Sequence, residues 1–310
     1  MKQDLYQFVV EASMEGLRLD QFLTESFKDR FSRSELQKWI KDGLVKIDGK
    51  EVKERSRKMN PGETVEATAR IAPAMDLTPA EMELEVIYED RSLAVLRKPA
   101  GLAVHPGPGD TSMTLLNGLL QRWPHLQGRG SRPGIVHRLD KPTEGLLIVA
   151  LDSEVQWKLS RMFQRREIRK EYLAYLLNTP GELEGKLEFP LMRDRNDRRK
   201  RSVHSAGRSA TTLYRVTDVM KTRKGRKLCR VEIDLITGRT HQIRAHFAHI
   251  GCPVVGDDLY SRSAKEFGKF GLLLLAQKLQ FTHPLSGKSL SFELPEPHRF
   301  LEFHRKAVFY

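Results

Sequence analysis

The sequence is poor in cysteine and in long apolar stretches. Its 310 residues include only two cysteines, Cys229 and Cys252, and no CxxC pair. This argues against a disulfide framework or a cysteine-based zinc site and fits a reducing compartment. Apolar runs such as 272–276 are far too short to span a bilayer. Acidic residues interrupt the N-terminal segment too early for a signal peptide. We therefore expect a soluble cytoplasmic protein that does not enter a membrane.

Common metal and cofactor motifs are also missing. The chain contains no GxxxxGK[ST], no GxGxxG after a strand and no HExxH. His241, His246 and His249 could be read as metal ligands, but their spacing matches no zinc signature and their segment contains no carboxylate. We expect no metal and no nucleotide or redox cofactor.

Acidic residues are outnumbered by basic ones. The chain has 53 Lys and Arg against 40 Asp and Glu, a formal net charge of +13 at pH 7. Such an excess favours a polyanionic partner, because phosphate neutralisation releases counterions. Two strongly basic segments, 193–202 and 221–227, are predicted to be exposed loops and are candidate phosphate contacts. The alternative is that they only aid solubility.

The pattern predicts two domains joined by a linker. In residues 1–71, Leu19, Phe22 and Leu23 recur at helical spacing, a second helix follows, and Asp48-Gly49 favours a tight hairpin turn. Residues 72–83 are rich in Pro and Ala without apolar period and form the predicted linker. Residues 84–310 form the second domain. Basic side chains decorate the first domain: Arg18, Arg33, Lys38 and Lys41.

The second domain shows both strand and helix patterns. Residues 145–151 form a continuous apolar run, which is typical of a buried strand. The helix predicted after it has an apolar face and an opposite stripe of Lys158, Arg161 and Arg165. Strands are predicted at 171–177 and around 230–235, and Thr240 is the predicted cap of a helix that Gly251 ends.

Three polar residues are candidates for chemistry. Arg138 and Asp140 lie in a polar run between two strand-like segments, so a turn there would project them from the end of a sheet. The alternative is a charged turn that Asp140 caps. Arg244 falls in or just after the first turn of the helix capped by Thr240, where the helix dipole disfavours a cation. A nearby anion must compensate, either a carboxylate or an RNA phosphate, unless Arg244 is a surface arginine paired with any acid.

Two further segments are less specific. Tyr172 lies in the predicted strand RKEYLAYLL, where a tyrosine is more often part of the core than of a site. The loop 98–110 is rich in turn residues and could line a cleft.

These segments resemble the motifs of the RluA-type pseudouridine synthases, and among them the ribosomal enzymes with an N-terminal S4 RNA-binding domain. HRLDKPTEGLLIVA resembles the family's catalytic motif and RKEYLAYL its Lys-x-Tyr motif. TGRTHQIRAHFAHIGCPVVGDDLY and LLLLAQKLQFTHP resemble the next two motifs, and residues 17–70 resemble the S4 module. Four motifs in the family order behind an S4 domain are highly specific.

The resemblance implies roles for five residues. Asp140 matches the essential aspartate, Arg138 the arginine that helps to displace the target base, and Tyr172 the tyrosine that stacks on the uracil. Arg244 matches the arginine that pairs with the aspartate, and Leu274 the apolar residue beside the flipped base. The implied reaction is isomerisation of uridine in structured RNA, expected to be ribosomal RNA or an assembling large ribosomal subunit, by a monomer.

The resemblance also implies the fold. We expect an α+β protein, with a small S4-like αα-β domain before a catalytic domain built on a mixed, mainly antiparallel sheet with flanking helices. Three positions depart from the motifs: Leu275 replaces the usual histidine, Glu144 the usual serine and Ser261 a common glycine. These departures weaken the prediction of the substrate more than the prediction of the chemistry. The main alternative is a non-enzymatic S4-type RNA-binding or ribosome-assembly factor, which would explain the charge but not Asp140, Tyr172 and Arg244.

Overall fold

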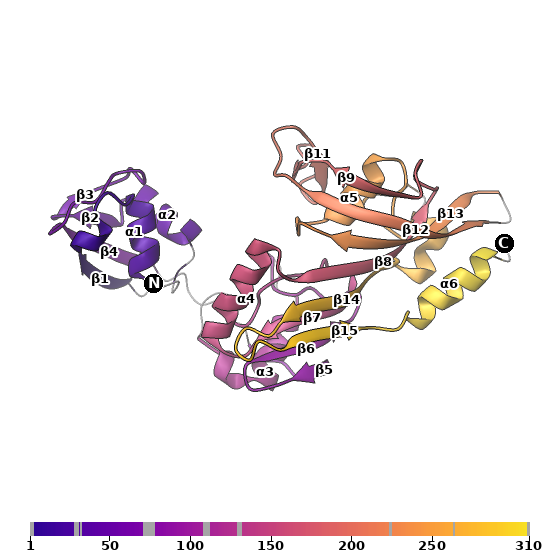
Figure 1. Cartoon of the computed structure of the whole chain (residues 1–310), viewed down its shortest axis with the longest axis horizontal. Coiled ribbons are helices and arrows are strands. Elements are labelled where there is room, and N and C mark those ends of the chain that lie inside the picture. The colour runs from indigo at the N-terminus through magenta and orange to yellow at the C-terminus, as the bar shows by residue number, and fades with distance from the viewer. Residues whose placement is uncertain are drawn as a thin grey trace. The chain divides into compact units, whose positions relative to one another are not determined.

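The chain forms two compact units in the computed structural model (Figure 1). One comprises Met1–Thr78 with Gln127–Pro133, and the other Pro79–Leu126 with Gly134–Tyr310. The structure describes residues 3–27, 31, 33–70, 78–107, 112–128, 132–222, 225–262 and 264–308. Residues 72–77, the first half of the predicted linker 72–83, lie outside them. Within these ranges, no helix is long and apolar enough to cross a membrane.

The first unit packs two helices on a small antiparallel sheet. Helices α1 (Leu19–Ser26) and α2 (Arg33–Lys41) follow strand β1 (Gln3–Val9) and the short η1 (Ala12–Met14). The sheet has the order β1-β4-β2-β3, with β2 (Val45–Ile47), β3 (Lys50–Glu51) and β4 (Thr64–Arg70). The predicted hairpin turn is present, with positive φ at Asp48 and Gly49. Strand β1 was not predicted.

The core of the first unit follows from the helical spacing seen in the sequence. The apolar faces of both helices are fully or almost fully buried against the sheet and include Leu19, Phe22, Leu23, Leu36, Trp39 and Ile40. The buried carboxylate of Asp20 joins the two helices, because it accepts hydrogen bonds from Arg18 Nε (3.0 Å) and from Gln37 Nε2 (3.0 Å).

A nine-stranded mixed sheet dominates the second unit. Its order is β5-β6-β7-β14-β8-β13-β12-β9, and β15 also pairs with β14. Only β7 and β14 run parallel, and every other pairing of the sheet's described strands is antiparallel. The prediction of a mixed, mainly antiparallel sheet is confirmed. The bounds are β5 (Glu85–Glu89), β6 (Leu93–Lys98), β7 (Glu144–Ala150), β8 (Arg169–Leu177), β9 (Glu184–Glu188), β12 (Thr211–Lys221), β13 (Lys227–Leu235), β14 (Leu274–Thr282) and β15 (Ser289–Glu293).

Helices and a small hairpin flank this sheet. The main core joins sheet residues such as Leu173 and Tyr175 to Leu159 of α4 and to Phe300 and Phe303 of α6. Strands β10 (Leu191–Arg193) and β11 (Arg201–Val203) pair separately. The helical segments are α3 (Leu115–Arg122), η2 (Pro124–Leu126), α4 (Ser153–Arg165), α5 (Gln242–His249), η3 (Ala264–Phe270) and α6 (His298–Val308).

The start of α5 differs from the prediction by one residue. The residue before the helix is His241, in the left-handed conformation at φ 58°, and not Thr240. The reason lies in Gln242, whose side-chain oxygen accepts hydrogen bonds from Thr237 Oγ1 (2.7 Å) and from Arg239 N (3.0 Å). These bonds fix the preceding loop without a threonine cap. Arg244 still lies in the first turn.

Candidate active site

Strand register places Tyr172 and Leu274 on one face of the sheet. Tyr172 of β8 lies opposite Ile233 of β13 and Ala276 of β14, and Leu274 lies opposite Ala174. Residues directly opposite one another across a ladder point to the same face, and so do residues two apart along a strand. Tyr172 and Leu274 therefore share the face turned away from the main core. Both are buried, with 7% and 3% of their surface exposed.

Helix α5 covers this same face. Tyr214 of β12 lies opposite Ile233 and therefore points to the side of Tyr172. Its ring packs edge-on against Phe247 of α5, with centroids 5.5 Å apart. Arg244, one turn earlier on α5, is 2% exposed. The sheet and the helix thus bring Tyr172 and Arg244 to one side of the molecule.

Arg244 bridges two carboxylates. Its Nε and Nη2 atoms each donate a hydrogen bond of 2.7 Å to Asp257, and its Nη1 lies 3.4 Å from Asp140 Oδ2. The Asp140 side chain is 13% exposed and belongs to the turn that precedes β7. Burial disfavours the charge of Arg244, but the hydrogen bonds and charge of Asp257 and the charge of Asp140 outweigh it, so the pKa of Arg244 is raised.

The phenol of Tyr172 lies in buried surroundings that keep it protonated. Burial is the main cause that raises its pKa far above the ordinary value, and the negative charge of Asp140 adds to the effect. The site therefore combines a carboxylate, a guanidinium and a neutral aromatic ring.

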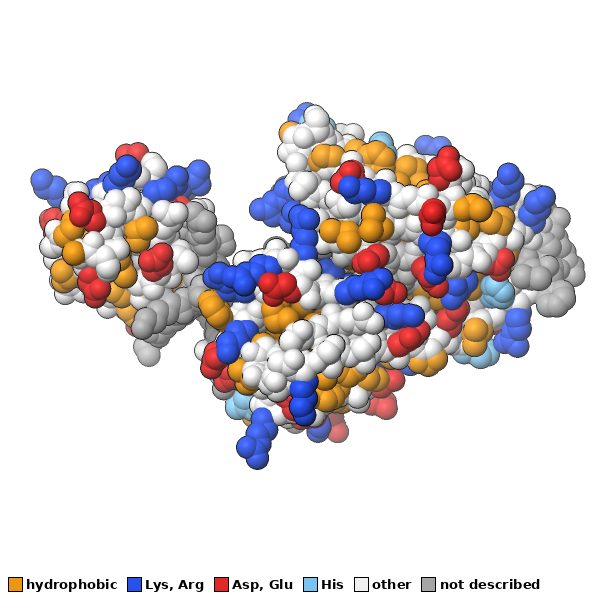
Figure 2. Space-filling view, viewed as in Figure 1, with side chains coloured by type: hydrophobic (Ala, Val, Ile, Leu, Met, Phe, Trp, Pro, Cys, Tyr) orange, Lys and Arg blue, Asp and Glu red, His pale blue; other side chains and the backbone are white. Residues whose placement is uncertain are grey.

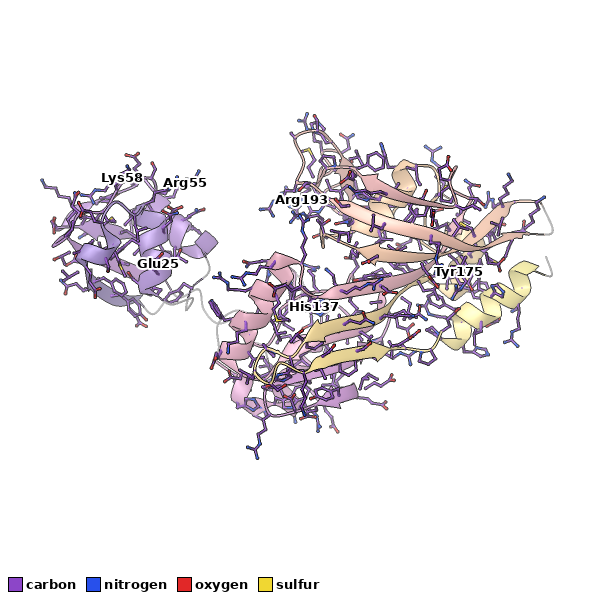
Figure 3. The ribbon with its side chains drawn as sticks, in the orientation of Figure 1. Glu25, Arg55, Lys58, His137, Tyr175 and Arg193 are labelled. Carbon is purple, nitrogen blue, oxygen red and sulfur yellow. The ribbon has the colours of Figure 1, made fainter. Side chains whose placement is uncertain are left out.

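The turn that carries Asp140 is fixed on both sides. His137 Nε2 accepts a hydrogen bond from Ile148 N (2.8 Å), and its ring stacks on Phe163 at a centroid distance of 4.5 Å. Burial lowers the pKa of His137 to about 3, so the ring is neutral and can accept this bond. On the other side, Lys98 Nζ donates to the carbonyl of Lys141, the residue after Asp140, at 3.3 Å. Figure 3 labels His137 beside β7 and α4.

Arg138 is not buried with Arg244, and its side chain contacts a neighbouring loop. It is exposed, and its Nη1 lies 3.4 Å from His105 Nε2. His105 belongs to the loop 98–110, of which residues 98–107 are described. Arg138 thus lies next to the loop that the sequence suggested as a cleft wall, two residues from Asp140.

Two residues of the site, Asp257 and Tyr260, were missed in the sequence, and a third, His241, was weighed there only as a metal ligand. Asp257 is fully buried against Arg244. His241 Nε2 lies 3.9 Å from Asp140 Oδ2, and burial lowers the pKa of His241 despite that carboxylate. The Tyr260 ring lies 5.3 Å from the Arg244 guanidinium. All three fall within the third motif, but no periodicity in the sequence distinguished them from their neighbours.

The candidate RNA contacts of the first unit remain predictions. Lys38 and Lys41 on α2 are exposed. The Arg18 side chain is 42% exposed and pairs with Asp20. The side chain of Arg33 lies outside the described residues.

The predicted basic stripe of Lys158, Arg161 and Arg165 lies on α4. Arg161 and Arg165 are exposed, whereas Lys158 is half-buried and paired with Glu154 at 2.6 Å. The guanidinium of Arg161 lies 5.1 Å from the ring of Trp157, which is 41% exposed. An arginine on an exposed aromatic ring is a surface that suits nucleic acid.

Further arginines gather near the same side of the second unit. Arg166, Arg208 and Arg239 come from separate segments, and burial together with the charges of Arg208 and Arg166 lowers the pKa of Arg239. Figure 2 shows Lys and Arg side chains along the hollow between α4 and the β10–β11 hairpin. Figure 3 labels Arg193 on this hairpin.

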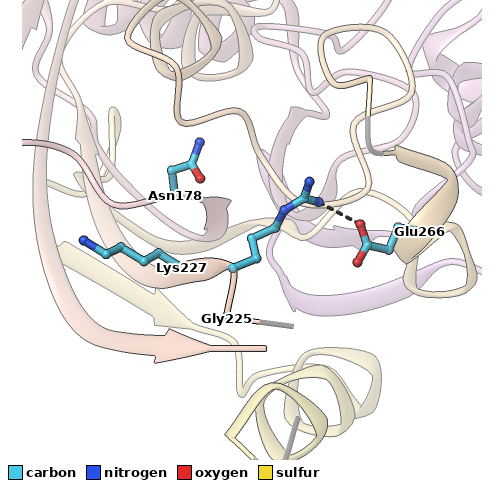
Figure 4. Close-up of a pocket in the computed structure, with 5 residues that line it drawn as sticks. Asn178, Gly225, Lys227 and Glu266 are labelled. Atoms are coloured by element: carbon cyan, nitrogen blue, oxygen red, sulfur yellow. Dashed lines mark hydrogen bonds and ion pairs between the residues drawn. The ribbon is translucent and has the colours of Figure 1, made fainter. Parts of the chain in front are cut away.

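Two other polar groupings do not form part of this site. A hollow of about 650 Å³ is lined by Asn178, Gly225, Arg226, Lys227 and Glu266 and contains the Arg226–Glu266 ion pair of 2.7 Å (Figure 4). It includes none of the candidate catalytic residues.

A Ser–His–Asp grouping near the edge of the sheet has the wrong geometry for a hydrolase. His283 Nε2 lies 3.2 Å from Ser92 Oγ and 3.0 Å from Asp90 Oδ2. The other ring nitrogen, Nδ1, accepts two backbone N–H groups. The proton of a neutral ring must therefore sit on Nε2, which leaves His283 no free lone pair with which to deprotonate the serine.

Comparison with known proteins points to one family. A model described as RNA pseudouridylate synthase matches residues 92–249, and an S4 domain model matches residues 17–65. An Aquifex aeolicus protein named as an uncharacterized RNA pseudouridine synthase is 39% identical, covering 96% of this chain and 95% of its own. Ribosomal large subunit pseudouridine synthase D of Yersinia pestis is 37% identical, covering 94% and 91%.

A solved structure agrees with these sequence matches. Human RNA pseudouridylate synthase domain containing 1 superimposes with a TM-score of 0.57 at 26% identity, covering 69% of this chain and 84% of that one.

Proposed function

Because the chain belongs to the RNA pseudouridylate synthase family, a family of isomerases, we propose that it converts specific uridines of large-subunit ribosomal RNA to pseudouridine, with Asp140 as the catalytic carboxylate. The observation that supports the site best is the contact of 3.4 Å between Arg244 and Asp140, on the side of the sheet that carries Tyr172. The ribosomal substrate is proposed from the name of the Yersinia pestis relative.

The reaction needs a group that assists departure of the base and a pocket that retains it. The N1–C1′ bond breaks, the uracil turns, and C5 joins C1′; C5 then loses its proton, and N1 gains one, so the overall change is an isomerisation. Glycoside hydrolases typically use two carboxylates, because they must protonate a leaving group and activate water. An isomerase retains its detached base and adds no water, so one carboxylate can suffice. Asp140 acts either as a nucleophile or as an electrostatic partner and base.

Arg244 keeps Asp140 ionised and oriented in this proposal. A guanidinium buried to 2% exposure is attracted to any nearby negative charge with little screening by solvent. Its contact with Asp140 therefore stabilises the carboxylate form that either route requires. Leu274, on the same face as Tyr172, supplies an apolar wall beside the base.

The target base must leave its stack before it reaches Asp140. Extrusion costs a few kcal/mol in a duplex, which favours loops and irregular RNA. Tyr172 stacks on the extruded uracil, and the exposed Arg138 occupies the space that the base leaves. Lys158, Arg161 and Arg165 of α4 contact the RNA backbone, as do the basic residues Arg18, Arg33, Lys38 and Lys41 of the S4-like unit.

We also propose the organisation of the working protein. Residues 1–71 form the S4-like RNA-binding domain, 72–83 a linker and 84–310 the catalytic domain, and the protein acts as a monomer in the cytoplasm. The S4-like domain holds the RNA while the catalytic domain selects the uridine.

The test is a map of pseudouridine in ribosomal RNA from cells with and without this protein. We expect one or a few uridines of the large-subunit RNA to lose the modification in cells that lack it. The purified protein should restore those sites either on protein-free RNA or on assembling particles. Identical maps from both cell types, together with no product in vitro, would favour the non-enzymatic RNA-binding alternative.

A further inference from the structure

Asp257 is a buried carboxylate, and both of its side-chain oxygens accept hydrogen bonds. It is 0% exposed, in a turn of the second unit. Its Oδ2 accepts from Arg244 Nε, and its Oδ1 accepts from Arg244 Nη2 and from the backbone N–H groups of Leu259 and Tyr260, both at 3.0 Å. Four donors offset the large cost of removing a carboxylate from water. Asp257 is therefore held in a fixed orientation.

The turn that carries Asp257 is fixed to the strands of the site. Val255 N donates to Tyr175 O of β8 (2.8 Å), and Leu273 N, next to the start of β14, donates to Val255 O (2.9 Å). Gly256 has φ +74°, and a Cβ there would meet the carbonyl oxygen of Gly271 at 1.8 Å. Only glycine allows this approach, so the position of Asp257 is set by the strands that carry Tyr172 and Leu274.

The two carboxylates hold Arg244 unequally. Asp257 makes two short bonds to the guanidinium, whereas Asp140 makes one contact of 3.4 Å. A two-point pair fixes the plane of a guanidinium, which a single contact cannot do. Tyr260 supports the same group: its ring lies 5.3 Å away, and its hydroxyl accepts a hydrogen bond from Arg201 N (2.6 Å). The remaining atom, Nη1, is left directed at Asp140.

We propose that Asp257 is a positioning residue for the isomerisation, because it holds the Arg244 guanidinium in the orientation that presents Nη1 to Asp140. This inference rests on the proposed function. It also explains how the site tolerates a change of charge at Asp140 during the reaction: Asp257 remains as a counter-charge, so the buried arginine is never unpaired.

The direct test is Asp257→Asn in the full chain. The amide oxygen can still accept the backbone N–H groups of the turn, but its NH₂ group faces an N–H group of Arg244, so the guanidinium must shift. With the protein in excess over large-subunit RNA, we expect the single-turnover rate to fall on the order of 100-fold, while the Kd for RNA stays within about 2-fold. Asp258→Asn is the matched control, because its side chain is 89% exposed and lies 3.8 Å from Nη2; its rate should equal that of the wild type.

A double-mutant cycle separates positioning from a structural role. Arg244→Lys keeps the charge but cannot form the two-point pair. If Asp257 acts through Arg244, Asp257→Asn should reduce the rate of Arg244→Lys by less than about 3-fold. The same loss in both backgrounds would overturn the inference, since it would mean that Asp257 only holds the turn.

Separate measurements distinguish a loss of folding from a loss of function. Urea unfolding and circular dichroism show whether each variant is folded. If Asp257→Asn is not, Asp257→Glu, which keeps the charge and alters the geometry of the pair, carries the same expectation of a slower rate with unchanged RNA binding. A folded variant at Asp257 with the wild-type rate would overturn the role of Asp257 alone. A wild-type protein that makes no pseudouridine would overturn the proposed function, and this inference with it.

Discussion

Replacing Lys98 by methionine should change how the stability of the protein depends on pH. Lys98 is fully buried at the end of β6, and its Nζ donates hydrogen bonds to the carbonyls of Pro99 (2.7 Å), Leu102 (2.8 Å) and Lys141 (3.3 Å). Burial lowers its pKa from an ordinary value of 10.5 to about 8, although the charge of Asp140 opposes this. The lysine therefore connects two loops, and the burial of its positive charge costs free energy.

The size of the effect follows from this pKa. Between pH 8 and 10.5 the unfolded chain holds a proton on Lys98 that the folded protein has lost, so the free energy of unfolding rises with pH in that range. At about 1.4 kcal/mol per pKa unit, the wild type should gain roughly 3 kcal/mol over Lys98→Met between pH 7 and pH 10. The variant also leaves three carbonyls without this donor, and each buried acceptor left without a hydrogen bond costs about 1–3 kcal/mol. Lys98→Met should therefore be less stable than the wild type at both pH values.

Urea unfolding at pH 7, 8, 9 and 10 measures this difference. Lys141→Met is the matched control, since it removes an exposed lysine next to the same loop and should keep a constant offset from the wild type. If the free energies of the wild type and Lys98→Met change in parallel from pH 7 to pH 10, Lys98 does not titrate as the structure implies.

Three further predictions concern the loop, the base and the RNA. His137→Gln should make the protein less sensitive to acid, because the unfolded chain protonates His137 near pH 6.5 and the folded protein only near pH 3. Between pH 6.5 and 4.5, urea unfolding should show that the free energy of unfolding of the wild type falls by at most about 2.7 kcal/mol more than that of the variant. Equal losses would contradict this. Arg138→Ala should slow single-turnover modification of structured RNA more than that of an unpaired oligonucleotide, and an equal effect on both substrates would exclude a role in base extrusion. Joint replacement of the α4 stripe by alanine should lower the salt dependence of RNA binding, reducing the slope of log Kd against log salt by about 2, and an unchanged slope would exclude these contacts: Lys158, Arg161 and Arg165.

Local patterns in the sequence were enough to predict most elements near the site. The apolar run at 145–151 corresponds to β7, and the spacing of Leu19, Phe22 and Leu23 marks the buried face of α1. The expected anion beside Arg244 is present as Asp257 and Asp140, although the predicted cap was wrong by one residue. Such features depend on neighbours within one or two turns, which a sequence displays directly.

Other features depend on contacts between distant segments. Asp257 and Asp258 are adjacent and identical in type, yet one is fully buried and the other is 89% exposed. Lys98 would be taken for a surface lysine, but three backbone carbonyls surround its amine. The mixed, mainly antiparallel character of the sheet was expected from the family resemblance alone. The order of its nine strands was not predicted, because no periodicity determines which strand lies beside which.

The central claim is that the carboxylate of Asp140 carries out the isomerisation and does not serve to bind RNA or to fold the chain. It is tested most directly by single-turnover pseudouridine formation on large-subunit RNA by Asp140→Asn, with Kd and urea unfolding measured on the same preparation. We expect no product above background, with Kd within about 2-fold of the wild type and an unchanged unfolding midpoint. Pseudouridine formed by the variant at the wild-type rate would contradict the claim.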